Sequence, residues 1–150
     1  MQRIGFVVYP DFQMIGFAAA TVFEVANIVN GEAIYEVNTI SESGGRVSSS
    51  GVMAVDSEAF RRPHYDMLIV CGGTDLPEAS VKLLPSLRTR AKSVRRIVSI
   101  CTGAIILAEA GSLKGRRATT HWLMARQLQS RYPDVTVEED RIFIVDGPPI

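Results

Sequence analysis

The sequence has few of the residues that build metal centres or disulfide frameworks. Its 150 residues include two histidines and two cysteines, Cys71 and Cys101. The cysteines are far apart, and the chain has no CxxC pair and no Cys/His cluster with metal-ligand spacing. The sequence therefore predicts neither a metal site nor a bound cofactor, and nothing in it suggests a secreted, disulfide-rich scaffold.

Net charge and long apolar runs are also missing. The 16 basic and 16 acidic residues balance to a formal charge of zero, so the whole chain has no electrostatic footprint for nucleic acid or an anionic membrane. The longest apolar stretches are far shorter than a membrane span, and no signal-peptide cleavage site follows the first of them. We therefore expect a cytoplasmic protein with no membrane partner.

Apolar residues make up 47% of the chain, which is enough for the core of a single domain. Short apolar runs alternate with helix-like segments, and turn residues separate them. Strands are predicted at 4–9, 35–40, 52–55, 66–71, 97–100, 135–137 and 142–145. Helices are predicted at 12–29, 77–94, 102–110 and 121–131, with Asp75 as the cap of the second. This order predicts an α/β fold with a mostly parallel sheet that helices cover on both faces.

Cys101 stands where a predicted buried strand gives way to a helix. The strand ends at Ile100, and Thr102 and Gly103 open the helix. A nucleophile in a tight strand-to-helix turn, followed by small residues, is the arrangement of a nucleophile elbow. The free N–H groups at the start of the helix favour negative charge at the sulfur. A cysteine at a strand end is otherwise often only a small core residue.

A second glycine-rich turn, Gly72-Gly73, follows the preceding predicted strand. Ligands of open α/β sheets bind beyond the carboxyl ends of the strands. If the two strands are neighbours, the amides of Gly72, Gly73 and Thr102 converge on one small pocket beside Cys101. Cys71 lies inside the earlier strand, and we expect it to be a core residue.

The block from Ser99 to Ala104, with Leu107–Gly111 and Gly115–Trp122, resembles the ThiJ/PfpI superfamily. The similarity runs from about residue 4 to residue 147, and 49–51 fits the same pattern. It implies a flavodoxin-like three-layer sandwich related to class I glutamine amidotransferases. Within the superfamily, the block looks most like the N-terminal domain of AraC-family transcriptional regulators.

One departure from the superfamily concerns catalysis. Catalytic members are expected to carry an acidic residue in the first loop, and here that position is Gly16. A positioned acid or base typically contributes ~10²–10⁴-fold in rate. Glu24 could replace the acid only if its helix faces Cys101. His121 is the remaining candidate base, although Thr120 could instead be a helix cap with His121 merely at the helix start.

The resemblance implies a domain whose pocket, around Cys101, Gly72, Gly73, Thr102, Gly16 and His121, binds an unknown small-molecule effector. It also implies a homodimer, to which the unusually apolar helix at 17–29 is expected to contribute. The domain is expected to be truncated after residue 147, with an AraC-type helix-turn-helix domain downstream as its only contact with DNA. The alternative function is a Cys-dependent hydratase or amidase resembling isocyanide hydratase. The basic stretch at 82–96 is interpreted as a solvated helix face, with an interdomain or DNA-facing surface as the alternative.

Overall fold

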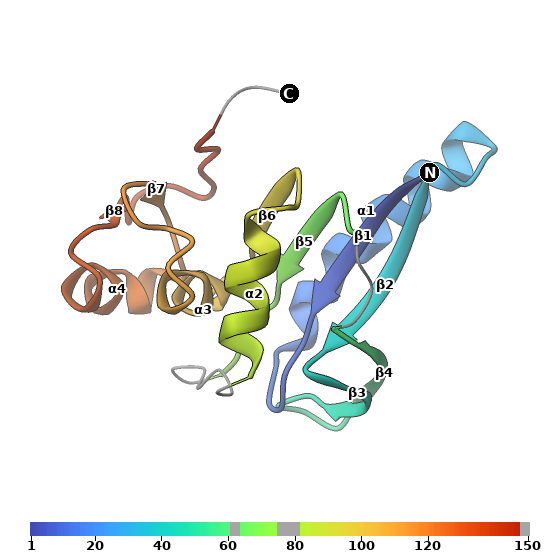
Figure 1. Ribbon diagram of the computed structural model, residues 1–150, viewed down its shortest axis with the longest axis horizontal. Helices are drawn as coiled ribbons and strands as arrows, with labels where there is room; N and C mark the ends of the chain where they lie inside the picture. Colours follow the sequence, from blue (N-terminus) through green and yellow to red (C-terminus); the bar gives the residue numbers. More distant parts are fainter. Residues whose placement is uncertain (61–63, 75–81, 148–150) are drawn as a thin grey trace.

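The fold is organised around a six-stranded sheet with the strand order β3-β4-β2-β1-β5-β6 (Figure 1). The computed structural model describes residues 1–60, 64–74 and 82–147. The strands are Gln2–Val7 (β1), Tyr35–Ser41 (β2), Ser43–Ser48 (β3), Ala54–Ala59 (β4), Met67–Val70 (β5) and Arg96–Ser99 (β6). Neighbouring strands run parallel except β3 and β4, which form an antiparallel hairpin at one edge. The predicted mostly parallel sheet is confirmed.

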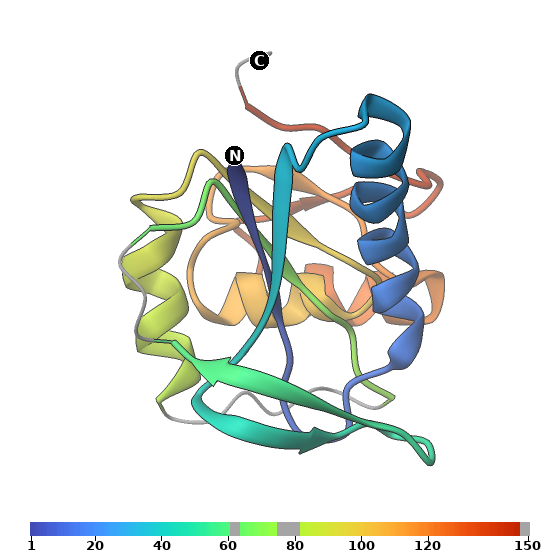
Figure 2. The same ribbon diagram turned by 90° about the vertical axis from the view of Figure 1, so that its right-hand side faces the viewer.

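Helices cover both faces of this sheet, as expected for a three-layer sandwich. The helix α1 (Ala18–Asn30) lies on one face and α2 (Leu83–Ala91) on the other (Figure 2). A short 3-10 helix, η1 (Met14–Phe17), leads into α1, and Gly31 ends α1 in the left-handed conformation that favours glycine (φ 71°). The aromatic ring of Phe17 stacks on Phe6 of β1 at 5.5 Å between centroids, which fixes α1 on the sheet.

The C-terminal elements gather beyond the β6 edge of the sheet (Figure 1). They are α3 (Gly103–Glu109), β7 (Arg117–Ala118), the 3-10 helix η2 (Trp122–Met124), α4 (Ala125–Arg131) and β8 (Thr136–Val137). β7 and β8 form a separate parallel pair. No helix in the described part of the chain combines the length and apolar character needed to cross a bilayer.

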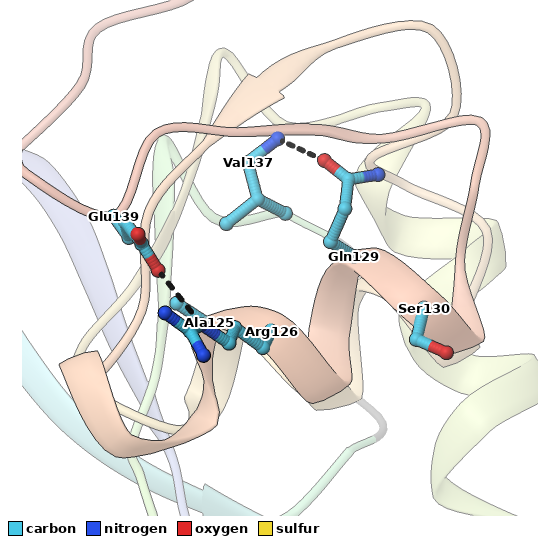
Figure 3. Close-up of a pocket in the computed structure, with 6 residues that line it drawn as sticks. All are labelled: Ala125, Arg126, Gln129, Ser130, Val137 and Glu139. Atoms are coloured by element: carbon cyan, nitrogen blue, oxygen red, sulfur yellow. Dashed lines mark hydrogen bonds and ion pairs between the residues drawn. The ribbon is translucent and has the colours of Figure 1, made fainter.

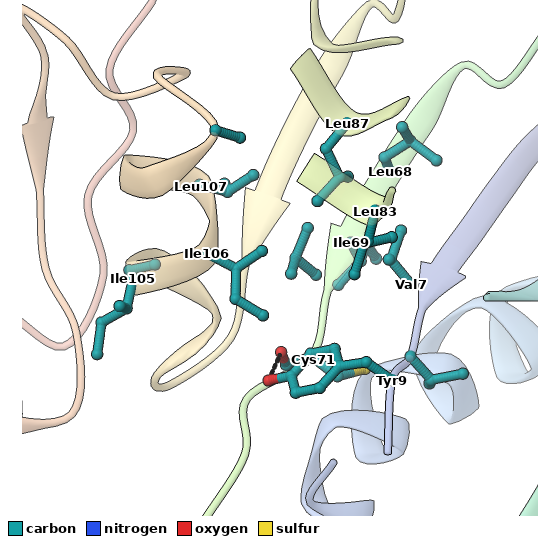
Figure 4. Packing of buried hydrophobic residues seen from close by; sticks show 14 of the residues in the cluster. Val7, Tyr9, Leu68, Ile69, Cys71, Leu83, Leu87, Ile105, Ile106 and Leu107 are labelled. Carbon is teal, nitrogen blue, oxygen red and sulfur yellow. Dashed lines mark hydrogen bonds between the residues drawn. The ribbon is translucent and has the colours of Figure 1, made fainter. Parts of the chain in front are cut away.

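The core joins the two helical layers to the sheet. Six of the seven residues of α3 are buried, and they pack near Leu83 and Leu87 of α2 and the apolar residues of β5 (Figure 4). The short apolar runs of β1 and β5 are buried on both faces, as is typical of the inner strands of a parallel sheet.

Three predicted elements differ from the structure. The hairpin returns at Ala54–Ala59 instead of 52–55, because Ser49 bonds to Gly51 and Met53 and so draws 49–53 into the turn. In the described part of the predicted helix at 77–94, α2 ends at Ala91, three residues before the predicted end. Pro85 fits in its first turn, where a missing N–H breaks no helical hydrogen bond. Residues 75–81, including the predicted cap Asp75, lie outside the described residues.

The predicted strand at 142–145 is wrong. These residues form no ladder with any described strand, and Ile142 is 98% exposed. The segment is held at its two ends instead, by a hydrogen bond from the Thr119 hydroxyl to the Arg141 carbonyl and by one from Arg116 to the Asp146 carbonyl. A short apolar run does not make a strand without a neighbouring edge to pair with.

Candidate functional site

Cys101 lies in a strained turn between β6 and α3. Its φ of 55° is in the left-handed region, and Asp11 (φ 64°) is the other non-glycine residue of the described chain with a positive φ. Holding a non-glycine residue in such a conformation costs roughly 1–3 kcal/mol, and such residues cluster at functional sites. Cys101 is half-buried, and its carbonyl accepts a hydrogen bond from the Thr120 hydroxyl at 2.9 Å. A positive φ in a turn between a strand and a helix is compatible with the predicted nucleophile elbow.

Gly103 lets the first turn of α3 come very close to the end of β5. A Cβ atom at this position would lie 2.3 Å from the carbonyl oxygen of Val70 and 2.9 Å from that of Cys71. Both atoms belong to the backbone of a buried strand end, so neither can move aside cheaply. Close packing of α3 on β5 therefore requires a glycine at position 103.

Thr102 joins the ends of the two strands that carry the predicted pocket. β5 and β6 are neighbours, as the prediction of a shared pocket required. The buried Thr102 hydroxyl donates a hydrogen bond to the Gly73 carbonyl at 2.9 Å and accepts one from the Gly73 amide at 2.8 Å. Gly72 packs on the same hydroxyl, which would lie 2.8 Å from an added Cβ. The Gly73 amide is therefore already paired and is no free donor for an oxyanion.

This Thr102–Gly73 pair supports a stability prediction. Thr102→Val keeps the side-chain shape but leaves the buried amide and carbonyl of Gly73 without partners, so we expect a loss of about 2–3 kcal/mol in the free energy of unfolding. Urea denaturation measures the change. Thr102→Ser keeps the hydroxyl and should lose much less. Equal losses in the two variants would show that the hydrogen bonds contribute little.

Tyr9 lies beside Gly73 and Cys71, although from the sequence it was expected only to end a strand. Its hydroxyl donates a hydrogen bond to the Cys71 carbonyl at 2.9 Å (Figure 4) and would lie 3.2 Å from an added Cβ on Gly73. Burial, followed by the neighbouring thiols Cys71 and Cys101, raises the pKa of Tyr9 far above its ordinary value. The hydroxyl thus stays protonated at neutral pH. The sequence offered one signal for this role of Tyr9, namely its position at a strand end directly before Pro10.

Gly16 lies against Cys71. The three atoms nearest to an added Cβ on Gly16 all belong to Cys71, and the closest is its Sγ at 2.9 Å. Cys71 is fully buried, as predicted, and burial raises the pKa of its thiol to about 12. A carboxylate side chain at position 16 would have to displace this sulfur. The position where an acid was expected is therefore filled by the core.

His121 caps the start of η2. Its Nδ1 accepts a hydrogen bond from the Leu123 amide at 3.3 Å, and its ring stacks on Trp122. A neutral imidazole that accepts at Nδ1 carries its proton on Nε2, so His121 must give up this cap before it can accept a proton. Thr120, the alternative cap, instead bonds to the Cys101 carbonyl and ties this segment to the elbow. Glu24 is exposed on α1.

A surface hollow of about 390 Å³ lies apart from these residues, between α4 and β8 (Figure 3). Gln129 lines the hollow and connects its two sides: its side-chain amide donates a hydrogen bond to the Val135 carbonyl and accepts one from the Val137 amide. None of its lining residues is a predicted site residue. Among the described residues, no three His, Cys, Asp or Glu side chains are grouped so that they could hold a metal ion.

Comparison with known proteins relates nearly the whole chain to one family. The model of the DJ-1/PfpI family matches residues 3–148. The HTH-type transcriptional regulator CdhR of Pseudomonas aeruginosa is 35% identical over 153 aligned residues, which cover 99% of this chain and 45% of the regulator. The isonitrile hydratase of Pseudomonas putida is 36% identical over 78 residues, covering 50% of this chain and 34% of the hydratase. The chain spans about half the length of the curated regulators it matches.

Solved structures agree with this fold. The crystal structure of an AraC family transcriptional regulator from Pseudomonas putida aligns with a TM-score of 0.79 at 23% identity. The alignment covers 97% of this chain and 80% of that chain. The chain therefore shares its fold with this solved structure.

Proposed function

The chain belongs to the DJ-1/PfpI family, and we propose that it is the effector-sensing domain of an AraC-type transcriptional regulator. The observation that carries this proposal is the similarity to HTH-type regulators along almost the entire chain, whereas the similarity to the hydratase extends over half of it. A helix-turn-helix domain follows the sensing domain in the proposed full-length protein. Sequencing the gene beyond the codon for Ile150 tests this arrangement, and a stop codon with no helix-turn-helix in between would refute it.

The proposed effector pocket lies at the carboxyl ends of β5 and β6. Cys101 and Thr102 form its floor, the Gly72-Gly73 turn one wall, and His121 lies near its rim, because Thr120 bonds to the elbow. Gly16 contributes through its contact with Cys71 beneath the pocket. Two features support sensing over catalysis: no carboxylate stands at position 16, and the Gly73 amide is already paired.

The alternative is a Cys-dependent hydratase or amidase, and the strained backbone of Cys101 favours it. In that case Cys101 would attack an electrophilic carbon, and the Thr102 amide would stabilise the developing negative charge. The paired state of Gly73 removes one of the two donors that such a site would use. We therefore treat catalysis as the second candidate.

A ligand screen on the chain distinguishes the two. We expect a small metabolite to raise the melting temperature, because a ligand at 100 times its Kd stabilises by about 2.7 kcal/mol. Cys101→Ala should weaken this shift, whereas Ser130→Ala, in the separate hollow of Figure 3, should leave it unchanged. In parallel, the chain is incubated with an alkyl isocyanide and with simple amides. Turnover that Cys101→Ala abolishes would overturn the sensing proposal in favour of the hydratase.

A homodimer through α1 is part of the proposal. α1 and the preceding η1 present large apolar side chains to solvent, all at least 49% exposed: Ile15, Val22, Val25, Ile28 and Val29. The spacing of Val22, Val25 and Val29 places them on one side of the helix. An apolar stripe of this size on a single helix is typical of a protein–protein interface. A second copy of the chain is its proposed partner.

A further inference from the structure

The cations of the chain are unevenly distributed, although the whole chain is neutral. Residues 82–96 contain six cations and no carboxylate: Lys82, Arg88, Arg90, Lys92, Arg95 and Arg96. The rest of the chain therefore has an excess of six acidic residues over basic ones. The segment includes α2, which lies on the opposite face of the sheet from the apolar stripe of α1 (Figure 2).

Four of these cations face solvent. Leu83 and Leu87 turn one side of α2 into the core, while Lys82, Arg88, Lys92 and Arg95 are exposed. Arg88 and Lys92 are four residues apart and thus neighbours on the helix surface. We call the exposed residues Lys82, Arg88, Lys92 and Arg95 the α2 basic face.

The α2 basic face lacks the ion pairs found elsewhere in the chain. Within the described residues, none of its four side chains has a carboxylate within 4.0 Å. In the C-terminal elements, by contrast, five cations each meet a carboxylate: Lys114, Arg117, Arg126, Arg131 and Arg141. The positive charge of the α2 basic face is therefore available to an outside partner.

Helix stability explains only part of this pattern. Cations near the C-terminal end of a helix interact favourably with its dipole, which accounts for Arg88 and Lys92. Arg88 is also anchored, because its Nε donates a hydrogen bond to the Ala110 carbonyl at 3.1 Å. Lys82, however, stands at the N-terminal end of α2, where the dipole disfavours a cation, and Arg95 lies beyond the other end. Helix stability therefore does not explain why cations stand at these two positions.

We propose that the α2 basic face binds the phosphate backbone of DNA, so that this domain contacts DNA itself in addition to any DNA-binding domain attached to it. The choice of DNA as the polyanion rests on the proposed function, whereas the surface rests on the charges alone. Such contacts carry no sequence information and act by releasing counterions from the phosphates. They would add affinity and hold the sensing domain in a fixed position along the duplex.

The test measures binding of the 150-residue chain to a fluorescently labelled duplex of mixed sequence, as a function of salt. Wild type is compared with the triple variant Lys82→Gln, Lys92→Gln, Arg95→Gln, which leaves the anchored Arg88 intact. If each residue meets one phosphate, the slope of log K against log salt should decrease in magnitude by about 2.7, at about 0.9 per phosphate. Affinity at low salt should fall by at least about tenfold.

A matched triple variant removes the same charge from the C-terminal elements: Lys114→Gln, Arg126→Gln and Arg131→Gln. It should keep the affinity and slope of wild type. An equal loss in both variants, or no binding of wild type at low salt, would overturn the proposal. So would tighter binding to polyglutamate than to the duplex, which would assign the surface to an acidic protein instead. No effector is present in the assay, so a failure of effector sensing leaves this result unaffected.

Discussion

Replacing Gly103 by alanine is expected to destabilise the protein by about 3 kcal/mol, at the upper end of the range for an overpacked core. The added methyl group would lie 2.3 Å from the Val70 carbonyl oxygen, far inside contact distance. To relieve this clash, α3 would have to move away from β5. Thr102 directly precedes Gly103 and would move with it. The shift would therefore also loosen the pair of hydrogen bonds between Thr102 and Gly73.

Urea denaturation measures the loss, and the melting temperature should fall by roughly 6–12 °C, at about 2–4 °C per kcal/mol for a chain of this size. Gly51→Ala is the matched control, because its added Cβ would meet only the Ser49 hydroxyl oxygen at an ordinary 3.8 Å. Similar midpoints for the two variants would mean that the elbow is packed much more loosely than the structure indicates. A selective loss in Gly103→Ala would establish that the turn around Cys101 depends on this close approach.

The strand-to-helix turn at Cys101 was predictable because its signals are local. The signals are adjacent in sequence: a short apolar run that predicts a buried strand, then a cysteine, a small residue and a glycine that are typical of a tight turn into a helix. The order of strands and helices follows from similar local patterns. Gly111 shows the same point, because it stops α3 with a φ of 76°, close to the predicted end.

The role of individual site residues was less accessible, because it depends on contacts between distant segments. The resemblance assigned the acidic position of catalytic members to Gly16 but could not show that Cys71 occupies the space beside it. The sequence suggested the Gly73 amide as a donor in the pocket, whereas the hydroxyl of Thr102, at the start of α3, already accepts a hydrogen bond from that amide. The strand expected at 142–145 failed for a similar reason, since strand formation depends on a neighbour that no local pattern supplies.

The short helix η1 connects the proposed pocket to the proposed dimer surface. The Gln13 amide donates a hydrogen bond to the Gly72 carbonyl at 2.8 Å, and Gly16 lies on Cys71. Ile15, between them in sequence, is 70% exposed and is one of the large apolar side chains that η1 and α1 present to solvent. One turn of helix thus contacts the pocket wall on one side and the proposed partner on the other. A change in pocket occupancy would therefore act on the dimer through η1, provided that the dimer forms through this surface.

The substitutions Val22→Glu and Ile28→Glu together are expected to convert the proposed dimer to a monomer. Each side chain is exposed in a single chain, at 65% and 71%, so neither supports the fold of the monomer. In a two-fold interface each residue occurs twice, and burying a valine or isoleucine contributes roughly 1.5–3 kcal/mol. If only a third of the summed burial energy of these four side chains is lost, the Kd of the dimer rises about a hundredfold, because about 1.4 kcal/mol corresponds to a tenfold change. Burying four added carboxylates weakens association further.

Sedimentation velocity across a range of concentrations measures the change in mass. Val52→Glu is the matched control, because Val52 is an exposed apolar residue too but lies at the tip of the β3–β4 hairpin, away from α1. It should leave the dimer intact. A wild-type protein that sediments as a monomer at every concentration, or a control that dissociates as readily as the double variant, would exclude the α1 stripe as the interface. Since η1 links the proposed interface to the proposed pocket, loss of the dimer should also change effector affinity. By linkage, the effector should change the dimer Kd by the same factor.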